Sequence, residues 1–442
     1  MTGRPEVLLQ RARDRWELDA EVVATLALRG WGVAAGLLTT LVVPWWLTPQ
    51  QQGYWYTFAS LAALQLFFEL GLGQVLLQLA GHEAAHAATD TAAAARLAAL
   101  ERWVRRWSGG AAAGFAVLVG PAGAWFLARS DGLPPALWLG PWCAMVLGTA
   151  GTLLLSGRLA VLEGSGRLAQ VARLRLVQSM VGSVAAWALL ALGTGLWAAA
   201  AVQAVGVACT LAWLRLQPPL VPPGTRHQPA QPLRWRGDIL PFQWRIGLSW
   251  MSGWFIFQAF TPLAFATLGP GEAGRLGISM AVFLAVQSVG MSWVHARTPQ
   301  FARHAARGER QALLALFRRA SATGVGFVAT ASAATLLALW LLGSVWPSLT
   351  HRLADLPVLA CLAANTVVNA CIYAAATLMR AHREDPLAWV SAASAVATVG
   401  LAAITVRWGL LPMMASCLAV SAGLSLPWTL RLLRRYTSPS NP

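Results

Sequence analysis

The sequence predicts an all-α polytopic membrane protein with about twelve transmembrane helices in two six-helix repeat bundles. Its composition is the first reason, since 57% of the 442 residues are hydrophobic, 11% are charged and the mean hydropathy is +0.55. The second is a series of apolar runs of about 20 residues, the length that crosses a bilayer core. The third is an internal repeat, which is the mark of many transporter folds.

The repeat is a hairpin turn that occurs once in each half of the chain. Leu47, Pro49 and Gly53 recur as Leu268, Pro270 and Gly274, with the same L-x-P-x-x-x-G spacing. We therefore expect an N-terminal six-helix bundle over 1–216 and a C-terminal six-helix bundle over 238–442. A linker at 217–237 with six prolines joins them.

Twelve apolar runs give the expected order of spans along the chain. Because each half holds an even number of spans, the two halves have the same orientation in the membrane. The expected spans are 22–47, 53–80, 109–129, 136–157, 172–192, 195–215, 242–267, 275–296, 321–346, 356–379, 386–406 and 410–431.

The arginines predict the orientation. The chain has 33 basic residues, all of them arginine, and 28 lie in the terminal segments and loops of one side. The other side carries four (Arg129, Arg275, Arg352 and Arg407), and Arg29 lies inside the first span. The positive-inside rule then places both termini in the cytoplasm. The same distribution explains the net charge of +16 without a nucleic-acid partner.

Enzyme, metal and cofactor signatures are missing from the sequence. The five cysteines lie in apolar runs with no CxxC or Cys/His spacing, so we expect neither disulfides nor a metal site. Without a G-x-x-x-x-G-K-[ST] loop, a gradient of H⁺ or Na⁺ would have to drive uphill transport. We expect no cofactor and no enzymatic activity.

Two Arg-rich segments, 82–107 and 298–319, are expected to form amphipathic elbow helices on the cytoplasmic face. Their arginines suit anionic headgroups, so membrane lipids are expected partners.

Several motifs resemble those of one bacterial family. LTPQQQGYW (47–55), FELGLGQVLLQLA (68–80), AVLEGSGR (160–167) and the stretch from FQWRIGLSWMSGWFIFQ (242–258) through LGPGEAGRLG to SWVHARTPQFA occur in the family's order. They resemble polysaccharide biosynthesis proteins of the O-antigen flippase type, in the multidrug/oligosaccharidyl-lipid/polysaccharide exporter superfamily. The resemblance covers most of residues 20–320, whereas the last four spans match by hydropathy only.

The resemblance implies that the two six-helix bundles surround a central cavity, which opens alternately to each side. It also implies a function and a set of partners. Such proteins move an undecaprenyl-pyrophosphate-linked oligosaccharide from the cytoplasmic to the periplasmic leaflet of the inner membrane. Expected partners are therefore this lipid-linked substrate, a polysaccharide polymerase and other assembly proteins.

Ionisable residues at membrane depth are costly, so they normally face a cavity or a partner. Arg29 lies about seven residues into the first span, where it could bind pyrophosphate or snorkel to the headgroups. Glu69 lies near the middle of the second span with Gln65 one turn earlier. Glu69 would either couple transport to protons or form a bridge with Arg29.

Amides in the second half are further cavity candidates. Asn365 and Asn369 begin a polar stripe that continues to Tyr373, and Gln258 and Gln287 lie in the repeated hairpin. Each would either bind sugar hydroxyls or form interhelical hydrogen bonds. Arg245, at the mouth of the seventh span, would either gather phosphate or anchor the helix at the membrane surface.

The leading hypothesis is a flippase for a lipid-linked oligosaccharide in the bacterial inner membrane. An ion-coupled drug exporter of the same superfamily is the alternative. A polymerase or ligase would need a long outer loop, and the longest one expected here spans about ten residues around 347–356. A structural partner of an envelope-synthesis complex, without transport activity, is a third possibility.

Overall fold

A computed structural model describes residues 20–87, 90–218, 220, 240–345, 350–381 and 387–437, and these residues are almost entirely helical, with no strand among them. In the first half the helices are α2 (Ala20–Trp46), α3 (Pro49–Ala62), α4 (Gln65–Glu69), α5 (Leu72–His86), α6 (Thr91–Ala128), α7 (Pro135–Leu162), η1 (Glu163–Arg167), α8 (Leu168–Ala191) and α9 (Trp197–Leu216). In the second half they are α10 (Leu240–Phe257), α11 (Phe260–Leu268), α12 (Pro270–Ala306), α13 (Arg310–Val345), α15 (Leu356–Ala381), α16 (Ala388–Thr405), η4 (Val406–Trp408), α17 (Leu410–Val420), η5 (Ser421–Ser425) and α18 (Leu426–Thr437).

The predicted spans agree with these helices. By length and composition, nine helical segments of the described chain could cross a membrane, or eleven with two bent pairs included. One of the nine, Pro135–Ala191, is far longer than a bilayer needs. Its helix breaks at η1, where Gly166 has φ +87°, so it counts as two spans, α7 and α8. The described helices thus account for all twelve predicted spans.

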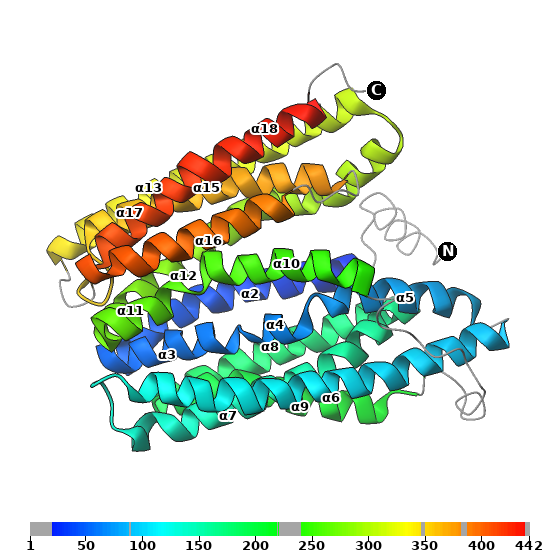
Figure 1. Ribbon diagram of the computed structural model, residues 1–442, viewed down its shortest axis with the longest axis horizontal. Helices are drawn as coiled ribbons and strands as arrows, with labels where there is room; N and C mark the ends of the chain where they lie inside the picture. Colours follow the sequence, from blue (N-terminus) through cyan, green and yellow to red (C-terminus); the bar gives the residue numbers. More distant parts are fainter. Residues whose placement is uncertain are drawn as a thin grey trace, which may run out of the picture.

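The helices form two groups that diverge along the molecule. We call the end where α2 begins and α18 ends the proximal end, and the opposite end the distal end. In Figure 1, α13 and α15–α18 slope away from α6–α9 toward the proximal end. The predicted linker falls in 217–237 and lies mostly outside the described residues, so the domain boundary stays a prediction.

The distribution of buried side chains explains the divergence. At the distal end, one core contains residues from both halves, including Phe58 and Trp142 from the first half and Phe265 and Phe283 from the second. Nearer the proximal end each half has its own core, one around Leu76 and Leu100 and another around Phe301 and others of α12, α13 and α15. The core that the two halves share therefore lies at the distal end.

The repeated turn forms the seam between the halves. Both copies start a helix with proline at its first turn, and the two helices, α3 and α12, cross at Gly53 and Gly274. A Cβ atom on Gly53 would lie 1.9 Å from the carbonyl oxygen of Pro270, and one on Gly274 would lie 2.8 Å from the Gly53 nitrogen. Glycine at both positions is thus required for the backbones to touch.

Two spans are broken where candidate site residues lie. The second span bends by 43° between α4 and α5, and Leu70 there has the left-handed φ of +48°, although it is not glycine. The seventh span bends by 40° between α10 and α11, next to Gln258. Unbroken spans were expected at both places, and the hydropathy pattern gave no sign of these bends.

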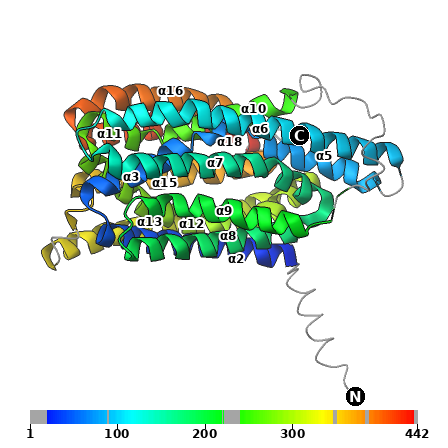
Figure 2. The same cartoon turned by 90° about the horizontal axis from the view of Figure 1, so that it is seen from below.

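The predicted elbow helices are wrong as separate elements. Within the described residues, 91–107 is the first part of the continuous helix α6, 298–306 is the last part of α12, and 310–319 begins α13. Figure 2 shows α5 and the start of α6 extending past the other helices at the proximal end. Amphipathic composition did not distinguish a surface helix from the extension of a span.

We predict that Gly53→Ala lowers the melting temperature of the purified protein, because its methyl group would overlap the Pro270 carbonyl and overpacking costs about 1–3 kcal/mol. Gly400→Ala in α16 is the matched control, since its Cβ would meet nothing within 4 Å. Thermal unfolding in detergent measures both. A Gly53→Ala variant as stable as Gly400→Ala would contradict the seam.

Candidate functional site

A cavity of about 160 Å³ lies between the two halves. Its walls come from α3, α12, α15, the break between α10 and α11, and Met414 of α17. Four amides predicted from the sequence line it together: Gln258, Gln287, Asn365 and Asn369. Residues that are more than 100 positions apart in the chain thus converge on one space.

Gln258 joins the halves across the cavity. Its Oε1 accepts a hydrogen bond from Ser60 of α3 at 3.3 Å. Beside it, Trp254 Nε1 donates to the Ser60 carbonyl at 3.0 Å. This amide therefore makes the interhelical bond that was one of its two predicted roles.

Asn365 has a different environment. Its Oδ1 is buried and has no hydrogen-bond partner among the described residues. Burying a polar atom without a partner costs about 1–3 kcal/mol, so such atoms normally bind water or a ligand. Asn365 lines the cavity between the halves, together with Thr366 one position on.

Arg29, His295 and Tyr373 lie close together toward the proximal end. The Tyr373 hydroxyl is 2.5 Å from His295 Nε2, which joins α15 to α12. Arg29 of α2 is exposed and close enough to affect both side chains electrostatically. Arg29 was one of the predicted cavity candidates, and Tyr373 belonged to the predicted stripe that starts at Asn365.

Glu69 lies elsewhere, in a second cavity of about 190 Å³ that is lined by the first half and by Trp250 of α10. Its side chain is hydrogen-bonded to Ser156 and lies near Arg175. Arg175 pairs directly with Glu163 at 2.8 Å. The predicted alternative of a bridge between Glu69 and Arg29 is therefore wrong, because the two side chains face different neighbours.

Gln65 and Arg245 are the remaining predicted residues. Gln65 begins the short helix α4 and lines neither cavity. Arg245 falls in α10, and its side chain lies outside the described part of the structure.

The ionisable groups and the amides are thus separated in space. Among the described residues, none that lines the cavity between the halves is charged, and the polar groups there are amides and the hydroxyls of Tyr56, Ser60, Thr261 and Thr366. Aromatic and methionine side chains complete the walls. Such a lining can hydrogen-bond a neutral, hydroxyl-rich group and pack against its apolar faces.

Comparison with known proteins shows the fold. No model of a protein family matches the chain, and no curated protein sequence does. Solved structures do match over nearly the whole chain. The lipid II flippase MurJ in an inward closed conformation is 9% identical, covers 94% of this chain and 87% of its own, and has a TM-score of 0.63.

Two further matches belong to the MOP superfamily. A multidrug resistance MATE family transporter in an inward-facing conformation is 17% identical, covers 91% of this chain and 99% of its own, and has a TM-score of 0.61. A MOP superfamily transporter from Pyrococcus furiosus, with a binding pocket described as having reverse polarity, is 15% identical over 95% of this chain and 96% of its own, with a TM-score of 0.54. The chain is a multi-pass membrane protein with the fold of these transporters.

We predict that Glu163→Gln destabilises the protein more than Glu69→Gln does. Glu163 makes a direct ion pair with Arg175, and its side chain is only 9% exposed. Removing its carboxylate charge therefore leaves the Arg175 guanidinium without its direct ion-pair partner. Glu69→Gln keeps the Glu163–Arg175 pair and a hydrogen-bonding group for Ser156. Melting temperatures in detergent test the order, and an equal loss for the two variants would contradict it.

Proposed function

We propose that the protein is a flippase that moves an undecaprenyl-pyrophosphate-linked oligosaccharide across the bacterial cytoplasmic membrane by alternating access. In this proposal the proximal end faces the cytoplasm and the distal end the periplasm. The oligosaccharide serves surface polysaccharide export, and a polymerase and assembly proteins act on it afterwards.

The observation that carries the proposal is the uncharged, amide-rich cavity between the halves. A saccharide cannot cross about 30 Å of hydrocarbon unaided, because its hydroxyls would lose their hydrogen bonds to water. Asn365, Asn369 and Gln287 supply replacement donors and acceptors. The unpartnered Oδ1 of Asn365 is a ready acceptor for a sugar hydroxyl.

The basic group needed for a diphosphate lies toward the proximal end. Guanidinium groups match phosphate oxygens in geometry and charge, and Arg29 is exposed there beside His295. A lipid-linked saccharide would then place its sugars among the amides and its diphosphate near Arg29. The Arg-rich proximal surface suits the anionic lipids of the cytoplasmic leaflet.

A drug exporter of the same superfamily is the second candidate. The aromatic and methionine side chains of the cavity, such as Phe257, Met280 and Met414, would suit an apolar drug. A cationic drug, however, would favour a carboxylate in the cavity, and its lining contains none. Glu69 lies in the other cavity, where it remains a candidate for coupling to H⁺ or Na⁺.

We predict that Arg29→Ala reduces flipping by about tenfold or more, since a charge-assisted hydrogen bond contributes about 1.5–3 kcal/mol. Arg29→Lys should rescue it only in part, because lysine lacks the planar fork. The assay uses sealed vesicles with purified protein, a labelled lipid-linked oligosaccharide and an ion gradient, and follows accessibility to an external glycosidase. Arg407→Ala, at an exposed distal position, is the control.

Two outcomes would count against the proposal. Wild-type flipping by Arg29→Ala would mean that Arg29 only contacts headgroups. If the oligosaccharide never becomes accessible with the wild-type protein while a cationic dye is expelled, the protein is a drug exporter.

We also predict that Asn365→Leu slows flipping by about tenfold, because it removes an acceptor from the cavity while keeping the number and branching of the side-chain heavy atoms. Thermal stability should stay the same or rise, since the unpartnered Oδ1 is removed as well. A variant that is equally stable and flips at the wild-type rate would exclude Asn365 from substrate binding.

A further inference from the structure

The distal turn of the second half, residues 350–355 before α15, contacts the first half. Arg352 Nη1 donates a hydrogen bond to the carbonyl oxygen of Leu47 at 2.9 Å. In return, Gln52 Nε2 of α3 donates to the Gly274 carbonyl at 2.8 Å and to the Arg352 carbonyl at 3.3 Å. These bonds join positions 222 to 305 residues apart in the chain.

Gln52 lies at the centre of this contact. Its side chain is next to the crossing of Gly53 and Gly274 and is 1% exposed. The glutamine thus has one donor group that serves a carbonyl in the repeated turn and a carbonyl in the distal turn. Both bonds must break if the distal ends of the halves separate.

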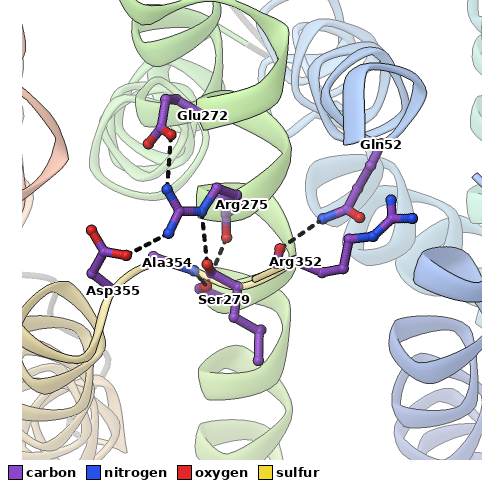
Figure 3. Close-up of polar contacts among 8 residues, drawn as sticks. Gln52, Glu272, Arg275, Ser279, Arg352, Ala354 and Asp355 are labelled. Atoms are coloured by element: carbon purple, nitrogen blue, oxygen red, sulfur yellow. Dashed lines mark hydrogen bonds and ion pairs between the residues drawn. The ribbon is translucent and has the colours of Figure 1, made fainter. Parts of the chain in front are cut away.

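Bonds within the second half hold its distal turn in place, independently of the contacts with the first half. Figure 3 shows Arg275 of α12 between Glu272 and Asp355. Arg275 pairs with Glu272 at 2.9 Å and with Asp355 at 2.5 Å, and its Nε donates to the Leu353 carbonyl at 2.9 Å. Ser279 Oγ accepts a hydrogen bond from the Ala354 nitrogen at 2.9 Å. Arg352 is therefore presented by a fixed turn, which lowers the entropy cost of its bond to Leu47.

The corresponding distal turn of the first half, residues 129–134 between α6 and α7, makes a contact of a different kind. A Cβ on Gly132 would lie 2.7 Å from the Pro270 ring, so this turn also reaches the opposite half. The Leu133 nitrogen of this turn donates a hydrogen bond to the Tyr54 hydroxyl at 3.4 Å, which lies in the same half. Each turn thus packs on the repeated motif of the other half, and the hydrogen bonds across the seam come from the second-half turn and Gln52.

We propose that Gln52 and Arg352 form a latch that holds the distal end of the central cavity closed, and that its release accompanies opening on that side. The proposal rests on alternating access as proposed above, but not on the identity of the substrate. The fold is shared with MATE transporters solved in inward-facing and outward-facing conformations, so both states are compatible with it. The latch favours the state in which the cavity is closed at its distal end.

The test measures how often the cavity opens at its distal end. Ala59 lines the cavity and is exposed within it, so Ala59→Cys is introduced after the five native cysteines are replaced. The rate at which a membrane-impermeant maleimide labels this cysteine is measured in two sets of vesicles. One set has the distal face of the protein outside, and the other has the proximal face outside. When opening is fast, the rate at the distal face is proportional to the open population, however small that population is.

Arg352→Ala removes one charge-assisted hydrogen bond, and Gln52→Leu removes two neutral ones. Each substitution should therefore raise the labelling rate at the distal face about tenfold. The matched control is Arg129→Ala, because Arg129 lies in the other distal turn and stacks on Trp125 of its own half at 3.7 Å. That control should keep the starting rate.

Folding is checked by size-exclusion profile and melting temperature. If the buried substitution Gln52→Leu does not fold, Arg352→Ala decides alone, since Arg352 is only part-buried. A distal-face rate for Arg352→Ala equal to that of Arg129→Ala would overturn the latch. Because labelling needs no substrate, this result is independent of whether the protein flips an oligosaccharide.

Discussion

The close contact between Gly53 and Gly274 is the constraint on which the rest of the structure depends. It lets the backbones of α3 and α12 touch at the distal end, so that the two repeated turns become neighbours. The shared apolar core forms directly beside it, with Tyr54 packing edge-on against Phe265 at 4.9 Å. Any side chain larger than hydrogen at the crossing would separate the halves where their joint burial is greatest.

The placement of polar groups follows from this asymmetry between the two ends. Where the halves share a core, side-chain donors bind backbone carbonyls of the opposite half, as with Arg352 Nη1 and Gln52 Nε2. Farther along, the halves separate and leave a cavity whose amides face the space between them. Arg29 and His295 lie nearer the proximal end, while Glu69 lies in a separate cavity lined mostly by the first half. A substrate with a neutral polar part and an anionic part fits this order.

Two spans are broken next to residues that line a cavity. Gln258 is at the break between α10 and α11, and Glu69 ends α4 just before the left-handed Leu70. Interrupted spans free backbone groups and are tolerated where they line a cavity or are buried in protein. Both breaks adjoin a cavity here, which links the local backbone geometry to the two places where ionisable or amide side chains gather.

The sequence by itself determined the membrane class, the twelve spans and the repeat, because hydrophobic length and arginine placement respond directly to the bilayer. It also predicted Gln258, Gln287, Asn365 and Asn369 as cavity candidates, because amides are rare and costly in apolar helices. Only the tertiary structure decided which of them meet, that Glu69 turns away from Arg29, and that Gln52 and Arg352 join the halves. Those facts depend on helix rotation and on contacts up to 305 residues apart, and local hydropathy carries no information about either.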